Sequence, residues 1–262
     1  MMASRQTKDP GLIAFNQLTI FAFFFAMRSC EYLKIKKGER RTKTLCLRNL
    51  VFRRKNRILS HDDPELELAD NVTVTFEYQK RDLRDDAVTQ SRTNDPLLCP
   101  VRVTAALVQR LRAIGCTPDT EVYRYRDATG RFRDMTNDVA IVLLRAFIKT
   151  HGRERGLSEK DVGLHSLRSS AAMAMYMNAI PVYTIMLLGR WSSDAFLLYI
   201  RKTVIEFSND VAKRMINNRV YHHIMPTDRE DPGTHNPMSA AANSGMGANG
   251  AANIRRAFSI WG

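Results

Sequence analysis

Large apolar side chains are densest between residues 12 and 27, where they fall on every side of a helix with 3.6 residues per turn. The segment 12–36 therefore predicts one helix, or two helices joined near Arg28, at the centre of the fold. The uncharged part, residues 11–27, is short for a membrane span and contains three polar side chains, so it predicts a buried helix.

The pattern changes to alternation between residues 44 and 92. Apolar and polar residues alternate from residue 72 to residue 78, which predicts a strand over 72–80. A charged turn at 80–86 follows, and residues 87–89 can return as the antiparallel partner of that strand. Apolar positions between 45 and 52 predict a further strand.

Helical periodicity returns after Pro100. Residues 100–113 predict a helix with proline near its start, and residues 122–126 predict a short strand followed by a D-A-T-G turn. Thr136 is a good cap for a helix that extends to about His151. These elements together predict a mainly α fold with a small antiparallel β-sheet.

The stretch 163–202 contains three further apolar helices. The first is broken at residues 178–181, the second begins at Pro181 and ends at Gly189, and the third carries Tyr199. Residues 203–217 predict one more amphipathic helix.

The composition indicates a class of binding partner and a cellular compartment. The net charge is +13 and the pI about 9.9. Arginines and acids cancel in residues 226–262, so the excess lies in residues 1–225 and favours a polyanionic partner such as nucleic acid. The four cysteines have no C-x-x-C spacing, which indicates reduced intracellular thiols and no metal site. We expect residues 1–11 to be loose, and residues 226–262, which hold few large apolar side chains, to be disordered.

Three motifs near the end of the foldable region resemble one family. H-x-x-R at 165–168, L-G-R-W-S-S at 188–193 and Y-I-R at 199–201 are similar to the C-terminal half of a tyrosine recombinase, most of all those of Crypton-type and DIRS-type mobile elements. Upstream, F-A-M-R-S-C-E-Y-L at 25–33 matches the family pattern G-x-R-x-x-E-L. Glu31 lies one turn after the arginine of that motif and is placed to support it or to cap nearby backbone.

The resemblance covers residues 12–217 and implies the DNA breaking–rejoining enzyme fold of the tyrosine recombinase catalytic domain. It implies that Arg28 and Arg168 clamp the phosphate, because a guanidinium donates two parallel hydrogen bonds and stays charged. By the same resemblance Lys80 protonates the leaving 5′-oxygen, and His165 bonds the phosphate or manages the tyrosine proton. Tyr199 is then the nucleophile that forms a 3′-phosphotyrosyl link, without metal or cofactor.

Two assignments stay open. The family usually has histidine or tryptophan directly after the glycine, where this chain has Arg190 followed by Trp191. Trp191 is the preferred candidate, because an indole both packs and donates a hydrogen bond. On the predicted hairpin Arg81 and Arg84 are cations near Lys80 and compete with it for the role of general acid.

The partners implied are duplex DNA and further copies of the chain, as a tetramer on DNA, in the nucleus and without a membrane. The family's N-terminal DNA-clamping domain is expected to be missing, since Arg28 lies so near the start. The function expected is that of a site-specific DNA recombinase or integrase. One alternative is a non-catalytic DNA-binding protein derived from a mobile-element recombinase. Another is a type IB topoisomerase-like enzyme, over which the G-R-W-S-S block favours the recombinase.

Overall fold

The computed structural model describes residues 7–35, 42–77, 86–152 and 156–191. These residues form helices, short 3₁₀ helices and two small antiparallel sheets, consistent with the expected helical fold with a small sheet. The chain divides into two compact units with the boundary after Ala171, and each is considered by itself.

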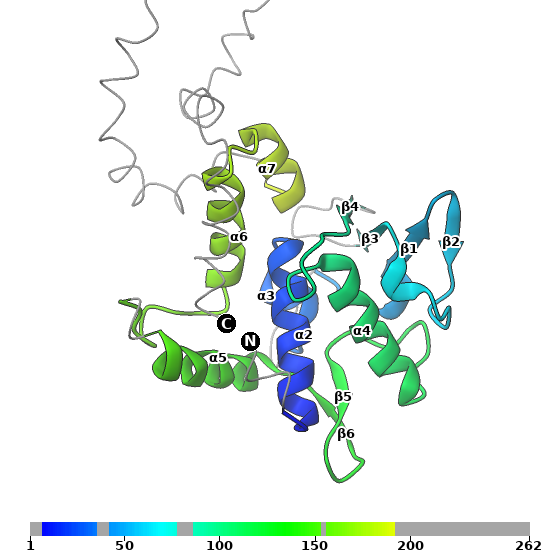
Figure 1. The fold of residues 1–262 in the computed structure, drawn as a ribbon. Helices are drawn as coiled ribbons and strands as arrows, with labels where there is room; N and C mark the ends of the chain where they lie inside the picture. The colour runs from blue at the N-terminus through cyan, green and yellow to red at the C-terminus, as the bar shows by residue number, and fades with distance from the viewer. Residues whose placement is uncertain (1–6, 36–41, 78–85, 153–155, 192–262) are drawn as a thin grey trace, which may run out of the picture. The chain divides into compact units, whose positions relative to one another are not determined.

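Helix α2 (Pro10–Phe24) is the central element of the first unit, as its pattern predicts. Asp9 caps it by accepting from the Leu12 N–H at 2.8 Å, and proline occupies its first turn. The helix packs against α4 (Pro100–Ala113), which lies beside it in Figure 1. Its buried side chains lie on all sides: Ala14, Phe15, Leu18, Thr19, Ile20, Phe21, Ala22 and Phe23. In the part of the chain that the structure describes, no helix is long and apolar enough to cross a membrane.

Helix α2 ends in a left-handed turn. Ala26 has φ of 45°, a conformation that an L-residue with a Cβ adopts at a cost of about 1–2 kcal/mol. Its N–H donates to the Phe23 carbonyl at 3.1 Å, and the Met27 N–H donates to the Ala22 carbonyl at 2.9 Å. These two bonds form a Schellman motif, which ends helices at a left-handed residue that is usually glycine.

A short helix, α3 (Ser29–Tyr32), follows this turn, so two helices joined near Arg28 are confirmed. The predicted helical end at Lys36 is wrong, because the backbone becomes extended at Leu33. Lys34 then pairs with Thr136 in an isolated β-bridge, and this distant partner takes the backbone groups that a longer helix would have used.

The larger sheet has the order β2-β1-β3-β4, all antiparallel. Its strands are β1 (Leu50–Arg54), β2 (Arg57–Leu59), β3 (Asn71–Phe76) and β4 (Asp86–Ser91). The pairing of β3 with β4 confirms the predicted return strand. One face of this sheet is buried, and α4 contacts β3 and β4. The apolar residues of the alternating pattern thus lie on the face of the sheet that packs against the core.

Two details of the predicted sheet differ. Strand β3 ends at Phe76, and the rest of the strand predicted over 72–80 lies outside the described residues after Glu77. The apolar positions near residue 45 do not form a strand. They lead into a 3₁₀ helix, η1 (Leu47–Asn49), because the Asn49 side chain accepts from the Cys46 N–H at 2.8 Å and closes a tight turn. A second 3₁₀ helix, η2 (Leu66–Leu68), precedes β3.

Most of the remaining elements of the first unit also contact α2. Helix α4 has the predicted bounds, and its inward residues are buried as expected. Strands β5 (Arg124–Arg126) and β6 (Phe132–Asp134) form a two-stranded hairpin, and α5 (Asn137–His151) follows. Thr136 caps α5 as predicted, by accepting from the Val139 N–H at 3.3 Å.

Helix α6 (Ser166–Met177) begins in the first unit and continues into the second, which also contains α7 (Val182–Gly189). The break between them is the predicted one, and Pro181 directly precedes α7. The small core of the second unit consists of Ala172, Tyr176, Val182 and Ile185. The predicted helices after Trp191, the segment 226–262 and residues 1–6 lie outside the described residues. The segment expected to be loose, 1–11, is too long, because Asp9 caps α2 and Pro10 and Gly11 already belong to that helix.

Candidate functional site

Arg28 stands at the turn between α2 and α3 and is held by Glu31. One carboxylate oxygen of Glu31 accepts from Arg28 Nη1 at 3.0 Å, and the other accepts from the Arg28 backbone N–H at 2.8 Å. Glu31 is fully buried, whereas the Arg28 side chain is 28% exposed. Both roles foreseen for Glu31, supporting the arginine and capping backbone, are confirmed. The buried carboxylate orients the guanidinium while part of it still reaches the surface.

Arg168 on α6 comes to the same turn from 142 residues away along the chain. Its side chain is 2% exposed, and its Nη1 donates to the Ala26 carbonyl. The left-handed conformation of Ala26 is part of this geometry, because it sets the direction of the carbonyl that receives the guanidinium. No local pattern in the sequence signals this contact, because Ala26 and Arg168 meet only in the folded chain.

His165 lies one turn before Arg168 at the start of α6. It is exposed, and its backbone carbonyl accepts from the Ser169 hydroxyl at 3.1 Å. Partial desolvation of the ring lowers the pKa of His165, and the positive charges of Arg168 and then Arg28 lower it further. Because Arg168 bonds the turn that carries Arg28 and His165 lies one helical turn before Arg168, the structure brings the three residues to one region.

This cluster has the chemistry of an anion site. Two guanidiniums and an imidazole converge, and Glu31 is committed to Arg28. Guanidinium donors match a tetrahedral phosphate, and a ring with a lowered pKa is neutral at neutral pH and able to accept a proton. Among the described residues, no group of three or more His, Cys, Asp or Glu is placed to hold a metal ion. The four cysteines are free and buried.

The neighbouring Tyr32 is a poor candidate for a nucleophile. It is 2% exposed, and burial, with the nearby charge of Glu31, raises the pKa of its hydroxyl. A phenol that stays neutral and lies beside a carboxylate is a poor nucleophile towards a phosphate.

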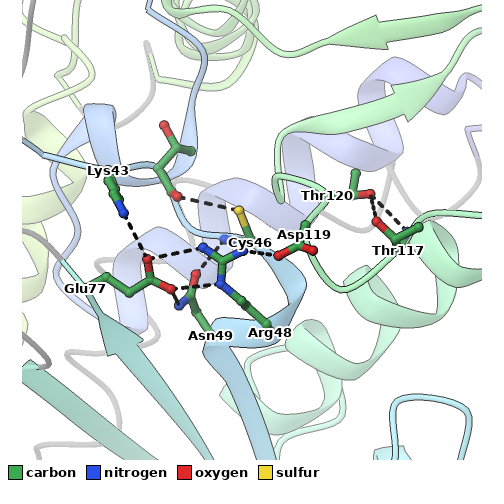
Figure 2. Close-up of polar contacts among 9 residues, drawn as sticks. Lys43, Cys46, Arg48, Asn49, Glu77, Thr117, Asp119 and Thr120 are labelled. Carbon is green, nitrogen blue, oxygen red and sulfur yellow. Dashed lines mark hydrogen bonds and ion pairs between the residues drawn. The ribbon is translucent and has the colours of Figure 1, made fainter.

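A second polar cluster supports the base of the predicted hairpin (Figure 2). Glu77 follows β3 directly, and its carboxylate accepts from Arg48 Nε at 2.9 Å and Nη2 at 3.2 Å. Asn49 Nδ2 donates to it at 2.8 Å, and Lys43 Nζ lies at 3.7 Å. Arg48 also pairs with Asp119. These contacts join three separate segments at the point where the chain enters the hairpin.

The hydrogen bonds from Arg48 and Asn49 lower the pKa of Glu77 to about 2. A carboxylate with a lowered native pKa stabilises the fold above its unfolded pKa, and this stabilisation is lost as the pH falls towards the native value. The network therefore contributes at neutral pH. Its worth is of order 1 kcal/mol, because the charges lie close to solvent.

Arg190 and Trp191 belong to the second unit. Arg190 ends α7 with φ of 55°, is 6% exposed, and donates from Nη1 to the Leu188 carbonyl at 3.2 Å. Trp191 is partly buried and packs against the core of the second unit. Its ring lies directly over Gly189, where an added Cβ would come within 1.6 Å of the ring. The glycine of the L-G-R-W motif thus leaves the space that the indole occupies.

The other predicted site residues are not placed. Lys80, with its competitors Arg81 and Arg84, and Tyr199 lie outside the described residues. Their roles remain predictions. Comparison of the chain with protein-family models, with curated proteins and with solved structures finds no match.

Proposed function

We propose that this chain is the catalytic domain of a tyrosine recombinase, which cleaves and rejoins DNA through a 3′-phosphotyrosyl intermediate. The observation that supports it best is the contact that brings Arg168, with His165 one turn before it, to the turn that carries Arg28. The motifs that predicted these residues carry no information about distance. Most arginine side chains of a basic protein are exposed to solvent, whereas Arg168 is buried beside the turn that carries Arg28.

In this mechanism the scissile phosphate sits against the guanidiniums of Arg28 and Arg168. Both donate to its non-bridging oxygens and stabilise the charge that develops in the transition state. The Tyr199 hydroxyl attacks phosphorus, the 5′-oxygen leaves with a proton from Lys80, and the DNA 3′ end is left joined to tyrosine. Neutral His165 accepts the tyrosine proton or bonds a phosphate oxygen. Rejoining is the reverse reaction, with a 5′-hydroxyl as the nucleophile.

The proposal includes the DNA breaking–rejoining fold, assembly of several copies on DNA, a nuclear location and action in DNA integration or recombination. It includes no metal, since the arginines and the lysine supply the positive charge. Cleavage is therefore expected to persist in EDTA. Activity lost in EDTA and restored by magnesium would indicate a two-metal nuclease instead.

Covalent trapping on nicked duplex DNA tests the proposal. A nick next to the cleavage site lets the leaving strand diffuse away, so a protein–DNA adduct accumulates and is seen on a denaturing gel. Because the target sequence is unknown, the substrate is a pool of nicked duplexes with random sequence. The wild-type chain is expected to form adduct, and Tyr199→Phe to bind DNA without forming it.

Two results would redirect the proposal. Adduct formed by Tyr199→Phe would assign the nucleophile to another tyrosine, of which Tyr183 is the first to examine because it is 70% exposed. DNA binding with no adduct from the wild-type chain would support the alternative, a non-catalytic DNA-binding protein.

A second experiment tests the general acid. Lys80→Ala is expected to cleave poorly, and to recover on DNA whose bridging 5′-oxygen is replaced by sulfur, because thiolate leaves without a proton. Tyr199→Phe provides the control, since sulfur cannot restore a missing nucleophile. Recovery of Arg81→Ala or Arg84→Ala in place of Lys80→Ala would move the role to that residue.

A further inference from the structure

The β5–β6 hairpin carries an unusual surface that the proposed chemistry does not use. Residues 124–134, RYRDATGRFRD, hold four arginines and two aspartates. Phe132 is 50% exposed. An exposed aromatic ring among arginines is poorly explained by folding alone, because the ring gains little from burial and the like charges repel.

Both aspartates of the hairpin are already engaged. Asp134 accepts from Arg124 Nε at 3.3 Å and from Lys34 Nζ at 2.6 Å. Asp127 accepts from Arg133 Nε at 2.9 Å, and the hydrogen bonds from Thr129 and Arg133 lower the pKa of Asp127. The ion pairs therefore account for two of the four arginines.

The other two, Arg126 and Arg131, are exposed and form no ion pair with any residue that the structure describes. Arg126 faces Phe132 across the hairpin, and its guanidinium carbon lies 4.8 Å from the ring centroid. Stacking uses the flat face of the guanidinium and leaves its N–H donors, which lie in the plane, available to an acceptor.

The hairpin is anchored at its base. The Arg124 carbonyl accepts from Arg110 Nη1 at 2.8 Å, and Arg110 also donates from Nε to Gln17 of α2 at 2.7 Å. At the tip, Asp127 Oδ1 accepts the N–H groups of Thr129 at 2.9 Å and Arg131 at 3.0 Å. Figure 1 shows the hairpin extending past the end of α2. A ribbon ordered at both ends binds without first losing conformational entropy.

From these contacts we infer that the β5–β6 hairpin is a DNA-binding arm, with Arg126 and Arg131 on backbone phosphates and Phe132 against an adjacent sugar or base edge. A two-stranded ribbon fits a groove of duplex DNA, and planar donors match phosphate oxygens. An anionic membrane is disfavoured, because the neighbours of Phe132 on the same face are charged and offer no apolar surface to enter a bilayer. The inference rests on the proposed function for its partner, DNA, but not on cleavage.

Fluorescence anisotropy on labelled duplex DNA at several salt concentrations tests the arm. The double variant Arg126→Gln, Arg131→Gln is expected to bind about tenfold more weakly at moderate salt, with the slope of log K against log salt reduced by about 2. Phe132→Ala is expected to weaken binding with an unchanged slope, since it removes a contact without removing charge.

The matched control removes the same charge elsewhere. Lys55→Asn with Lys160→Gln changes two exposed lysines on other segments, the β1–β2 turn and the connection between α5 and α6. Asparagine suits the left-handed backbone at Lys55. This control is expected to lose less than threefold in affinity. Equal losses in the hairpin and control variants would overturn the arm, because only the net charge would then matter.

A measurement on the wild-type chain guards against misfolded variants. Bound duplex DNA is expected to protect Arg126 and Arg131 from an arginine reagent such as phenylglyoxal, read by mass spectrometry. Unchanged modification with saturating DNA would overturn the inference. So would hairpin variants that keep DNA affinity but lose binding to phosphatidylserine vesicles.

Covalent trapping in the same samples separates the two proposals. Hairpin-dependent binding without any adduct leaves the arm standing and refutes the recombinase mechanism. Adduct formation together with DNA affinity that the hairpin variants do not change supports the recombinase mechanism and refutes the arm. A wild-type chain that fails to bind DNA refutes both proposals.

Discussion

The turns that end α2 and α7 share a backbone conformation but differ in the contacts that their arginines make. Each places a residue other than glycine in the left-handed region, Ala26 at φ of 45° and Arg190 at φ of 55°. Each is closed by the two hydrogen bonds of a Schellman motif. In each case a nearly buried arginine donates to a main-chain carbonyl.

The two arginines differ in how far their partners lie along the chain. Arg168 bonds Ala26 across 142 residues, whereas Arg190 bonds Leu188 two residues before it. The first contact joins distant segments and brings a second guanidinium to Arg28. The second lies within one turn of chain, at the end of its own helix. Of these two contacts, only that of Arg168 joins segments that are distant in the sequence.

Replacing each arginine by methionine gives the largest expected contrast. Arg168→Met removes a guanidinium from the proposed phosphate site, so the cleavage rate is expected to fall by about 10²–10³-fold. It also leaves the Ala26 carbonyl without its donor, at a cost of about 1–3 kcal/mol in the free energy of unfolding. Arg190→Met is expected to keep cleavage within about tenfold. Single-turnover cleavage and urea unfolding measure both, and equal losses of rate would place Arg190 at the phosphate.

Gly189→Ala tests the second turn through its neighbour. The new methyl group would meet the Trp191 ring, so the indole must move, at about 1–3 kcal/mol. In a Trp261→Phe background Trp191 is the sole tryptophan, and its fluorescence is expected to shift to the red. The same change in a Trp191→Ala chain is expected to cost much less. A full loss of stability there would mean that the backbone, and not the indole, excludes the methyl group.

Glycine at each turn separates backbone strain from side-chain contact. Ala26→Gly keeps the carbonyl that Arg168 uses and relieves the left-handed conformation, so it is expected to raise the free energy of unfolding by up to about 1 kcal/mol. Arg190→Gly relieves the same strain but loses a buried side chain, and is expected to be neutral or destabilising. Thermal unfolding compares them. A destabilised Ala26→Gly would show that this turn is not strained in solution.

The smallest expected effect is on the titration of His165. Desolvation and the two arginines lower its pKa, so its NMR titration midpoint is expected below that of an unfolded peptide. Because the native pKa of His165 is lowered, the neutral ring contributes to the stability of the fold at pH values above the pKa of the unfolded chain. This contribution is lost as the pH falls through the native pKa.

Inorganic phosphate bound between the arginines would offset their charge and raise the midpoint of His165. Arg168→Met is expected to raise it as well, in the absence of phosphate. A midpoint that neither change moves would place His165 away from the arginines.

Local sequence determined much of the fold. The bounds of α4 follow from Pro100 and its apolar period, and the pairing of β3 with β4 follows from alternation across a charged turn. Glu31 could be assigned to Arg28 because residues three apart on a helix are neighbours. Each of these depends on interactions between residues close together in the sequence, and composition alone reported the excess of positive charge.

Tertiary structure decided the rest. The sequence placed the end of the first helical region at Lys36, but a bridge to Thr136 ended it at Tyr32. Sequence also nominated Arg168 as a site residue, but only the fold turned the Ala26 carbonyl towards it. The physical reason is the same in both cases. A hydrogen bond to a distant partner depends on where the intervening chain brings that partner, and no local pattern of apolar and polar residues carries this information.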